Sequence, residues 1–323
     1  MSKPKVIATR RWPEPVETHL FEHYDFTLNE DDHPMGVDEL HQALREYDAV
    51  CPTVTDPNTA EVLGIDGIRA KILGNFGVGF NHIDLDAAKQ AGLVVTNTPE
   101  VLTDCTADIA MNLMLTAARR TGEGERHLRA GEWVGWRPTH MLATKVTGKT
   151  LGCVGFGRIA QAMAQRCHFG FGMKVIFHDP YPPKPEVVEK FQATACDSVE
   201  EVLEQADFVS LHCPGGESTY HLINDERLAR MKPSAILVNS ARGDIIDNQA
   251  LIKALKNGTI AGAGLDVFEG EPKLDPGFLE LENAVLVPHL GSASTETRIA
   301  MGMRVVENLD LFFADQEPRD RVA

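Results

Sequence analysis

Polar side chains follow three apolar segments in the C-terminal half of the chain, where each segment ends. Arg242 follows AILVNSA, Asp266 and Glu271 follow AGAGL, and His289 follows AVLVP. The carboxyl ends of parallel strands meet at one edge of a doubly wound sheet, so we expect these side chains to converge. Arg242 could clamp a carboxylate and His289 exchange a proton, with Glu271 fixing the imidazole tautomer. This set suits hydride transfer to a 2-oxo acid.

Arg242, Glu271 and His289 each also have a purely structural interpretation. A histidine after proline in a loop is often structural, and an arginine before glycine often belongs to a surface turn. Glu271, between glycine and proline, could simply be solvated. Motif matches of this kind give false positives. The hypothesis therefore depends on whether the fold brings the three together.

A glycine-rich turn near the middle of the chain predicts a dinucleotide site. Residues 155–160, GFGRIA, fit the pattern G-x-G-x-x-[G/A] between an apolar strand and a helix. Gly155 permits the tight turn and Gly157 lets the backbone approach a pyrophosphate, while Ala160 is small enough where helix packs on strand. The helix opens at Arg158, and its first amides would face the phosphates.

The nucleotide preference depends on Asp179, which ends the next apolar segment, KVIFHD. Its distance from the glycines is typical of the acid that binds the ribose hydroxyls. A carboxylate there repels the 2′-phosphate of NADP, and the following Pro180 and Tyr181 supply no arginine to offset that. The sequence favours NAD over NADP; the alternative is an ordinary surface aspartate.

Composition narrows the class of protein. The net charge of −16 argues against nucleic acid or an anionic membrane as a partner. The 6 cysteines show no C-x-x-C pair and no zinc spacing, which predicts reduced thiols, no metal site and a cytoplasmic setting. We expect no signal peptide, and no apolar run approaches the roughly 20 residues that span a bilayer.

Apolar and helical segments alternate along the chain, which predicts parallel sheets flanked by helices. The first turn, TRRWPEP, has no glycine fingerprint, so we expect the N-terminal part to bind no dinucleotide. The alternation restarts at the glycine-rich turn, and residues 293–313 form a last amphipathic helix. We expect an α/β protein of two doubly wound parallel-sheet domains. A Rossmann NAD-binding domain, residues 102–291, is inserted into a flavodoxin-like substrate-binding domain, residues 1–101 and 292–323.

Two further segments carry a specific expectation. Residues 74–80, GNFGVGF, form a tight, glycine-rich backbone that could expose amides to a carboxylate, in the manner of an anion nest. Residues 106–120, TADIAMNLMLTAARR, predict a helix buried on more than one side, in the core or at a subunit interface.

From about residue 45 to its end the chain resembles the D-isomer-specific 2-hydroxyacid dehydrogenases, most of all the glyoxylate/hydroxypyruvate reductase branch. The resemblance rests on an ordered set of stretches. These are GNFGVGFNHIDLDAAKQAGLVVTNTPEVLTDCTADIAMNLML, GKTLGCVGFGRIAQAMA, LHCPGGESTYHLIN, LVNSARGDIID, GLDVFEGEP and VPHLGSAS.

The resemblance implies a homodimer, with the long helix after Thr103 against its partner, and catalysis by Arg242, Glu271 and His289. The family's NAD(P) contacts fall on Thr106, Arg158, Ile159, Asp179, Pro214, Thr219, Ala241 and Asp266. Its substrate contacts fall on Val78, Gly79, Arg242, His289 and Trp136. Trp136 matches a tryptophan that lines the pocket of the other subunit; interface packing alone is the alternative.

Several alternatives stay open. Many reductases of this branch carry a basic residue where this chain has Asp179, and they use NADP. The preferred nucleotide and the direction of the reaction are therefore open. Another D-2-hydroxyacid dehydrogenase, for 3-phosphoglycerate, lactate or a bulkier acid, is the alternative enzyme. A nucleotide-sensing corepressor of the same fold is the alternative outside enzymes.

Overall fold

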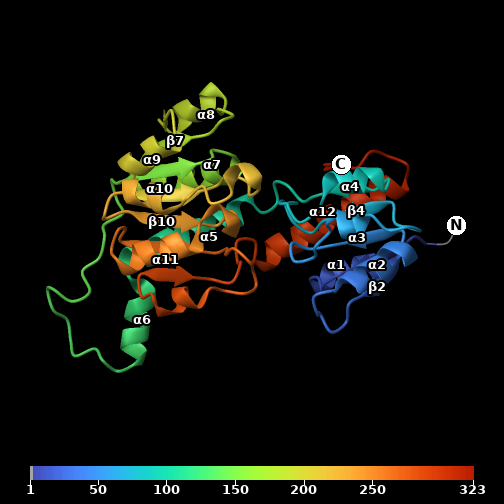
Figure 1. The fold of residues 1–323 in the computed structure, drawn as a ribbon, viewed down its shortest axis with the longest axis horizontal. Coiled ribbons are helices and arrows are strands. Elements are labelled where there is room, and N and C mark those ends of the chain that lie inside the picture. Colours follow the sequence, from blue (N-terminus) through green and yellow to red (C-terminus); the bar gives the residue numbers. More distant parts are fainter. Residues whose placement is uncertain (1–2) are drawn as a thin grey trace. The chain divides into compact units, whose positions relative to one another are not determined.

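The computed structural model describes residues 3–323, which divide into two compact units. Unit 1 runs to Leu102 and resumes at Ala293, and unit 2 comprises Thr103–Ser292. The chain therefore leaves unit 1, completes unit 2 and returns to unit 1 for its last helix. Each unit has its own parallel sheet (Figure 1). No helix in residues 3–323 is long and apolar enough to cross a membrane.

Unit 1 contains a 5-stranded sheet in the order β2-β1-β3-β4-β5, with every neighbouring pair parallel. This is the flavodoxin-like order that the alternation of segments predicted. The strands are β1 (Lys5–Ala8), β2 (Asp25–Leu28), β3 (Ala49–Cys51), β4 (Ile72–Gly74) and β5 (Val94–Thr96). The helices are α1 (Glu14–His23), α2 (Val37–Glu46), α3 (Ala60–Leu63), α4 (Leu85–Gln90) and α12 (Thr295–Phe313).

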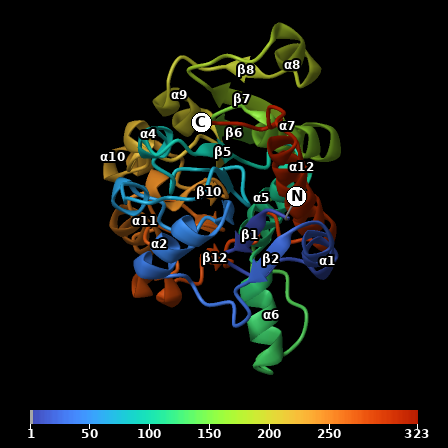
Figure 2. The same cartoon turned by 90° about the vertical axis from the view of Figure 1, so that its right-hand side faces the viewer.

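The C-terminal helix α12 packs tightly into unit 1. A Cβ built on Gly74 of β4 would lie 2.7 Å from a methyl of Val305, and one built on Gly302 would lie 2.8 Å from Val16 of α1. Both glycines thus allow a close approach of α12, which lies beside α1 in Figure 2. The chain end then reaches β5, where Arg321 forms an antiparallel bridge with Thr96.

Unit 2 contains a 7-stranded parallel sheet in the order β12-β11-β10-β9-β6-β7-β8. The strands are β6 (Thr150–Val154), β7 (Lys174–His178), β8 (Thr194–Ala195), β9 (Phe208–Leu211), β10 (Ile236–Asn239), β11 (Gly262–Leu265) and β12 (Ala284–Leu286). The chain order reverses between β6 and β9, which is the topological switch point where Rossmann sheets bind nucleotides. The two predicted sheet classes are both confirmed.

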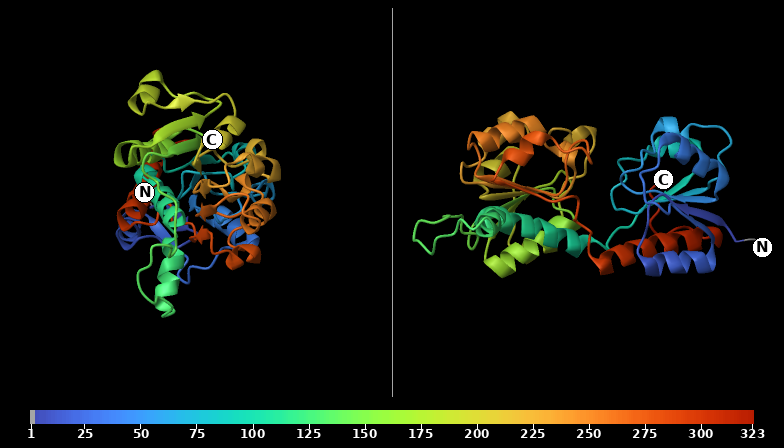
Figure 3. Two further views of the ribbon diagram at one scale, coloured as in Figure 1. Left: turned by 90° about the vertical axis from the view of Figure 1, so that its left-hand side faces the viewer. Right: turned by 90° about the horizontal axis from the view of Figure 1, so that it is seen from below.

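The helices of unit 2 cover both faces of its sheet, as the right-hand view of Figure 3 shows. One apolar cluster lies under α5 and α7, and the other under α9, α10 and α11. The helices are α5 (Thr103–Arg119), α6 (Thr121–Arg129), α7 (Arg158–Gln165), α8 (Pro185–Lys190), α9 (Val199–Gln205), α10 (Asp225–Arg230) and α11 (Asn248–Lys256). Shorter turns are η1 (Arg166–Gly170), η2 (Glu217–Thr219), η3 (Gly243–Ile245) and η4 (Pro276–Glu280). The Met-rich helix α5 contacts β10, β11 and α7, as expected for a helix buried on more than one side.

Candidate active site

The three polar strand ends of unit 2 come from neighbouring strands. Arg242 follows β10, Asp266 follows β11 and His289 follows β12, and these strands pair in parallel in that order. Their carboxyl ends therefore share one edge of the sheet, as the sequence predicted. Glu271 lies in the loop between β11 and β12.

His289 and Glu271 form a hydrogen-bonded pair. The Nδ1 atom of His289 lies 2.8 Å from Oε2 of Glu271, and Oε1 of Glu271 accepts the Phe268 amide at 3.0 Å. Burial would raise the pKa of Glu271, but the bond with His289 and the charge of Arg242 outweigh it and hold this pKa below its usual value. An ionised carboxylate only accepts, so Nδ1 carries a proton and Nε2 is left to exchange one.

The loop that carries His289 is fixed by Asp266, which is 1% exposed. Its two carboxylate oxygens accept the amides of Leu290 at 2.5 Å and Gly291 at 2.8 Å, and its carbonyl accepts the amide of His289. Burial raises the pKa of Asp266 despite these amides. His289 adopts a φ of 54°, a left-handed conformation that needs such external support. Asp266 therefore positions the histidine through the backbone.

Arg242 is the cation of this cluster. Burial lowers the pKa of its guanidinium, and the charges of Glu271 and Asp244 oppose that effect. An arginine pKa starts so far above neutrality that the group stays charged. The side chain of Asn239 positions Arg242. Its Nδ2 atom donates to the Arg242 carbonyl at 2.8 Å, and its Oδ1 atom accepts the backbone amide of Ala241 at 3.0 Å. A partly buried arginine with this backbone support is preorganised to bind a carboxylate.

The glycine-rich turn of unit 2 fits a dinucleotide. Gly155 has a φ of 84°, and a Cβ there would lie 2.8 Å from the Cys213 amide of the neighbouring strand end. Gly157 is the N-cap of α7, and a Cβ there would meet nothing within 4 Å, so the space beside it is open. Ala160 is fully buried where α7 packs on the sheet, so a larger residue would not fit.

Asp179, directly after β7, has both oxygens engaged by backbone amides. Oδ2 accepts the Phe156 amide at 2.6 Å, and Oδ1 accepts the Tyr181 amide at 2.8 Å. The carboxylate is thus fixed next to the glycine turn, and each oxygen keeps a lone pair for a further donor. This is the placement that ribose hydroxyls require. The residues present therefore fit the nucleotide implied by the turn.

The other predicted cofactor contacts lie on the same end of unit 2. Thr219, in η2, donates to the Pro214 carbonyl at 2.7 Å, which closes the loop after β9. Thr106 of α5 is buried, and a Cβ on Gly291 would lie 3.4 Å from its methyl group. Thr106 therefore lies beside the loop held by Asp266. Arg158 and Ile159 open α7, and Ala241 precedes Arg242.

Two predicted substrate contacts lie in unit 1, and one lies on an arm of unit 2. Val78 and Gly79 belong to the loop after β4 and are partly exposed. Trp136 lies in the loop after α6, which extends away from the body of unit 2 in Figure 1, and its side chain is 82% exposed. Among residues 3–323 no hydrogen bond or ring contact is recorded for Trp136. The structure does not bring Trp136 to His289 within its own chain.

Comparison with known proteins identifies the family of this fold and site. The profile of the D-isomer specific 2-hydroxyacid dehydrogenase family, NAD binding domain, matches residues 111–291. The chain belongs to this family. It is accordingly an NAD(P)-dependent dehydrogenase, and the predicted resemblance is confirmed.

Full-length relatives agree with this assignment. The dehydrogenase is 45% identical to a glyoxylate reductase of Korarchaeum cryptofilum, over 99% of this chain and 96% of the relative. It is 38% identical to a glycerate dehydrogenase of Hyphomicrobium methylovorum, over 97% of both chains. Among solved structures, an NADPH-dependent glyoxylate/hydroxypyruvate reductase of Sinorhizobium meliloti, in complex with NADP and malonate, matches with a TM-score of 0.88 and 33% identity, over 100% of this chain and 97% of that one.

The sequence analysis missed two features that support the dehydrogenase site. A Cβ on Gly243 would lie 1.9 Å from the carbonyl carbon of Phe268, so the loops carrying Arg242 and Glu271 touch only because this residue is glycine. His221 Nε2 lies 3.1 Å from both carboxylate oxygens of Glu269, two residues before Glu271. The glycine directly after Arg242 could have indicated from the sequence that another loop approaches closely there. Nothing local in the sequence indicated the His221–Glu269 pair.

Proposed function

We propose that this dehydrogenase reduces glyoxylate or hydroxypyruvate, reversibly, to glycolate or D-glycerate with NADH. The observation that carries the proposal is the hydrogen-bonded pair of His289 and Glu271 beside the partly buried Arg242. The same chain is 45% identical over its length to a glyoxylate reductase. An acid–base pair next to a carboxylate clamp is what reduction of a short 2-oxo acid needs.

The chain's own residues supply binding and proton transfer. When bound, NADH supplies the hydride that reduces the carbonyl carbon. Arg242 binds the substrate carboxylate and orients the carbonyl group. His289 donates a proton from Nε2 to the carbonyl oxygen, and Glu271, kept ionised, stabilises the imidazolium before the transfer. In the reverse direction the same nitrogen removes the hydroxyl proton.

We propose NAD as the preferred nucleotide, with contacts at Gly155, Gly157 and the other cofactor residues named above. The fixed carboxylate of Asp179 supports this preference, because a 2′-phosphate beside it would meet a like charge. The segment 179–183, DPYPP, contains no lysine or arginine to compensate.

The proposed substrate is small and carries no phosphate. We assign the amides of Val78 and Gly79, in unit 1, to the substrate carboxylate. The segment GNFGVGFNHID contains no lysine or arginine for a phosphoryl group, and His82 is its one basic side chain. A short acid is therefore favoured over 3-phosphoglycerate.

We also propose that the enzyme is a homodimer. The arm formed by α6 and the loop after it exposes large apolar side chains: Leu128 at 59%, Trp133 at 53%, Val134 at 79%, Trp136 at 82% and Leu142 at 68%. Apolar groups gathered in this way are typical of a surface that another chain covers. Sedimentation equilibrium should give twice the mass of one chain. A monomer at micromolar concentration would contradict this proposal.

The activity is tested by following NADH and NADPH absorbance with a panel of acids: glyoxylate, hydroxypyruvate, pyruvate and phosphohydroxypyruvate. We expect kcat/KM to be highest for glyoxylate or hydroxypyruvate, and higher with NADH than with NADPH. A preference for pyruvate or for the phosphorylated acid would assign a different dehydrogenase. Binding of NADH without turnover of any acid would favour the sensor role.

A further inference from the structure

We propose that Asn75 and Asn97 are positioning residues for the substrate. By binding the carbonyl groups of the loop after β4, they turn its amides outward to receive the substrate carboxylate. The inference rests on the proposed function, which assigns that carboxylate to the amides of Val78 and Gly79. The inference adds to that function the two side chains that hold the carbonyl groups of the loop inward and leave its amides facing outward.

Side-chain amides bind three successive carbonyl oxygens of the loop. The Nδ2 atom of Asn75 donates to the carbonyls of Gly77 at 3.0 Å and Gly79 at 3.1 Å. The Nδ2 atom of Asn97 donates to the carbonyl of Val78 at 2.8 Å. A side-chain amide has two hydrogens, so Asn75 can serve both of its acceptors.

The amides of the same peptide groups have no such partners. Among residues 3–323, no hydrogen bond is recorded from the backbone N–H of Val78, Gly79 or Phe80. In a planar trans peptide the C=O of one residue and the N–H of the next point in opposite directions. Binding the carbonyls of residues 77, 78 and 79 therefore directs the N–H groups of residues 78, 79 and 80 away from the two asparagines. The N–H groups of residues 78 and 80 thus face away from Asn75, and that of residue 79 faces away from Asn97. Backbone amides turned away from their own chain in this way are the donors that an anion-binding loop uses.

The two asparagines are themselves held in place. Asn75 is 0% exposed and Asn97 is 8% exposed, so neither can swing into solvent. The Oδ1 atom of Asn75 lies 3.1 Å from Nε2 of His82. The backbone N–H of Asn75 donates to the Thr96 carbonyl at 3.0 Å. These contacts orient the Asn75 side chain with its NH₂ toward the loop.

The start of the loop is anchored to the rest of unit 1. The Phe76 amide donates to the Pro52 carbonyl at 2.8 Å, and the Phe76 ring lies 4.8 Å from the ring of Trp12. Residue 52 follows β3 and Trp12 follows β1, so the loop rests on two neighbouring strand ends. The amides are thus fixed before a ligand arrives, which lowers the cost of binding.

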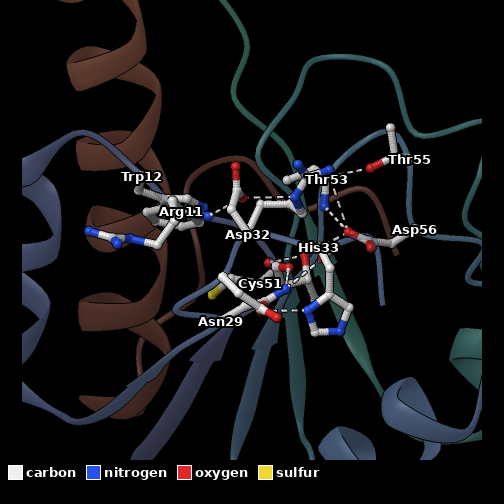
Figure 4. A network of polar contacts seen from close by, with 12 residues as sticks. Arg11, Trp12, Asn29, Asp32, His33, Cys51, Thr53, Thr55 and Asp56 are labelled. Carbon is white, nitrogen blue, oxygen red and sulfur yellow. Dashed lines mark hydrogen bonds and ion pairs between the residues drawn. The ribbon is translucent and has the colours of Figure 1, made fainter. Parts of the chain in front are cut away.

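Unit 1 offers a matched control for these side chains in Asn29, which Figure 4 shows. Asn29 is also buried, and its Nδ2 atom also donates to two carbonyls, those of Thr9 at 2.8 Å and His33 at 2.7 Å. It braces the loops after β1 and β2 and makes no recorded bond to residues 74–80. Loss of Asn29 should lower the stability of unit 1 without changing the polarity of the anion site.

The experiment measures oxamate, an anionic analogue of the substrate, against Asn75→Leu, Asn97→Leu and Asn29→Leu in the full chain. Oxamate binding to the enzyme–NADH complex is followed by protein fluorescence, together with the Kd for NADH and the thermal midpoint. We expect the Kd for oxamate to rise about tenfold in the first two variants, because misdirected loop amides lose hydrogen bonds to a charged group. The Kd for NADH should change less than twofold, and Asn29→Leu should lower only the thermal midpoint.

Asn97→Ser, too short to reach the Val78 carbonyl, replaces Asn97→Leu if that variant does not fold. Unchanged oxamate affinity in folded Asn75 and Asn97 variants would overturn the inference, as would an equal loss in Asn29→Leu. The same experiment distinguishes failure of this inference from failure of the proposed function. If the unmodified enzyme reduces none of the acids but the asparagine variants lose oxamate affinity as expected, the positioning role stands and the substrate assignment falls.

Discussion

The Nδ1 atom of His289 lies 2.8 Å from Oε2 of Glu271, and the two residues reach this position from different loops at one sheet edge. Asp266 fixes the histidine loop through the amides of Leu290 and Gly291. The Phe268 amide fixes the glutamate. The acid–base pair is therefore preorganised by bonds between carboxylate side chains and backbone amides within unit 2.

Removing the proton donor should lower kcat and leave NADH binding intact. We expect His289→Ala to lower kcat about 10²-fold or more, as for removal of a general acid. Glu271→Gln should lower kcat at least about tenfold, because a neutral amide stabilises the imidazolium less well than a carboxylate does. Steady-state kinetics with glyoxylate, and NADH titration by fluorescence, give the two readouts. Near-normal turnover in His289→Ala would remove His289 from the mechanism.

Gly243 should tolerate no side chain. A Cβ at this position would lie 1.9 Å from the Phe268 carbonyl carbon, so Gly243→Ala must push apart the loops that carry Arg242 and Glu271. We expect kcat/KM to fall by at least about 10²-fold, in line with the sensitivity of catalysis to small misplacements. Gly170→Ala is the control, since a Cβ there meets nothing within 4 Å and no positive φ is required. Equal activity of the two variants would contradict the prediction.

The nucleotide preference should weaken when Asp179 loses its charge. In Asp179→Ala the like charge beside a 2′-phosphate is gone, together with an acceptor for the ribose hydroxyls. We expect the ratio of kcat/KM for NADH to that for NADPH to fall about tenfold or more, which corresponds to roughly 1.4 kcal/mol. The Asp179 carboxylate also holds the Phe156 amide, so the thermal midpoint must be measured alongside. An unchanged ratio in a folded variant would place the discrimination elsewhere.

Stability should depend on pH through His212, a residue outside the proposed proton transfer. Burial lowers the pKa of His212 to about 4, whereas an unfolded histidine titrates near 6.5. Between these values the unfolded chain binds a proton that the folded chain does not, so stability present above about pH 6.5 is lost as the pH falls. The loss by pH 5 amounts to up to about 2 kcal/mol.

The control for this effect is His212→Gln, which keeps a polar atom near Oγ of Ser210, the 2.9 Å partner of His212 Nε2. Thermal midpoints measured at pH 7 and pH 5 should differ less in this variant than in the unmodified chain. Parallel pH profiles of the two proteins would assign the acid sensitivity to other groups.

Sequence patterns determined the features that depend on neighbouring residues. Alternating segments predicted both parallel sheets, and the glycines at 155 and 157 predicted the turn between β6 and α7. Strand ends followed by polar residues predicted which side chains gather at one edge. The sequence patterns did not reveal the helix α1 or the strand β2, because EPVETHLFEH has a mixed polar pattern and Phe26 is the one buried residue of DFTL.

Only the tertiary structure decided how distant residues meet. The sequence offered Asp266 as a cofactor contact, and the fold shows both of its oxygens bound to the amides that hold His289 in place. Gly243 mattered because another loop, that of Phe268, passes through the space of its missing side chain. Asn75 and Asn97, 22 positions apart in the chain, bind one loop because β4 and β5 pair side by side. Local signals arise within a few residues, whereas these contacts depend on the order and register of strands in a sheet.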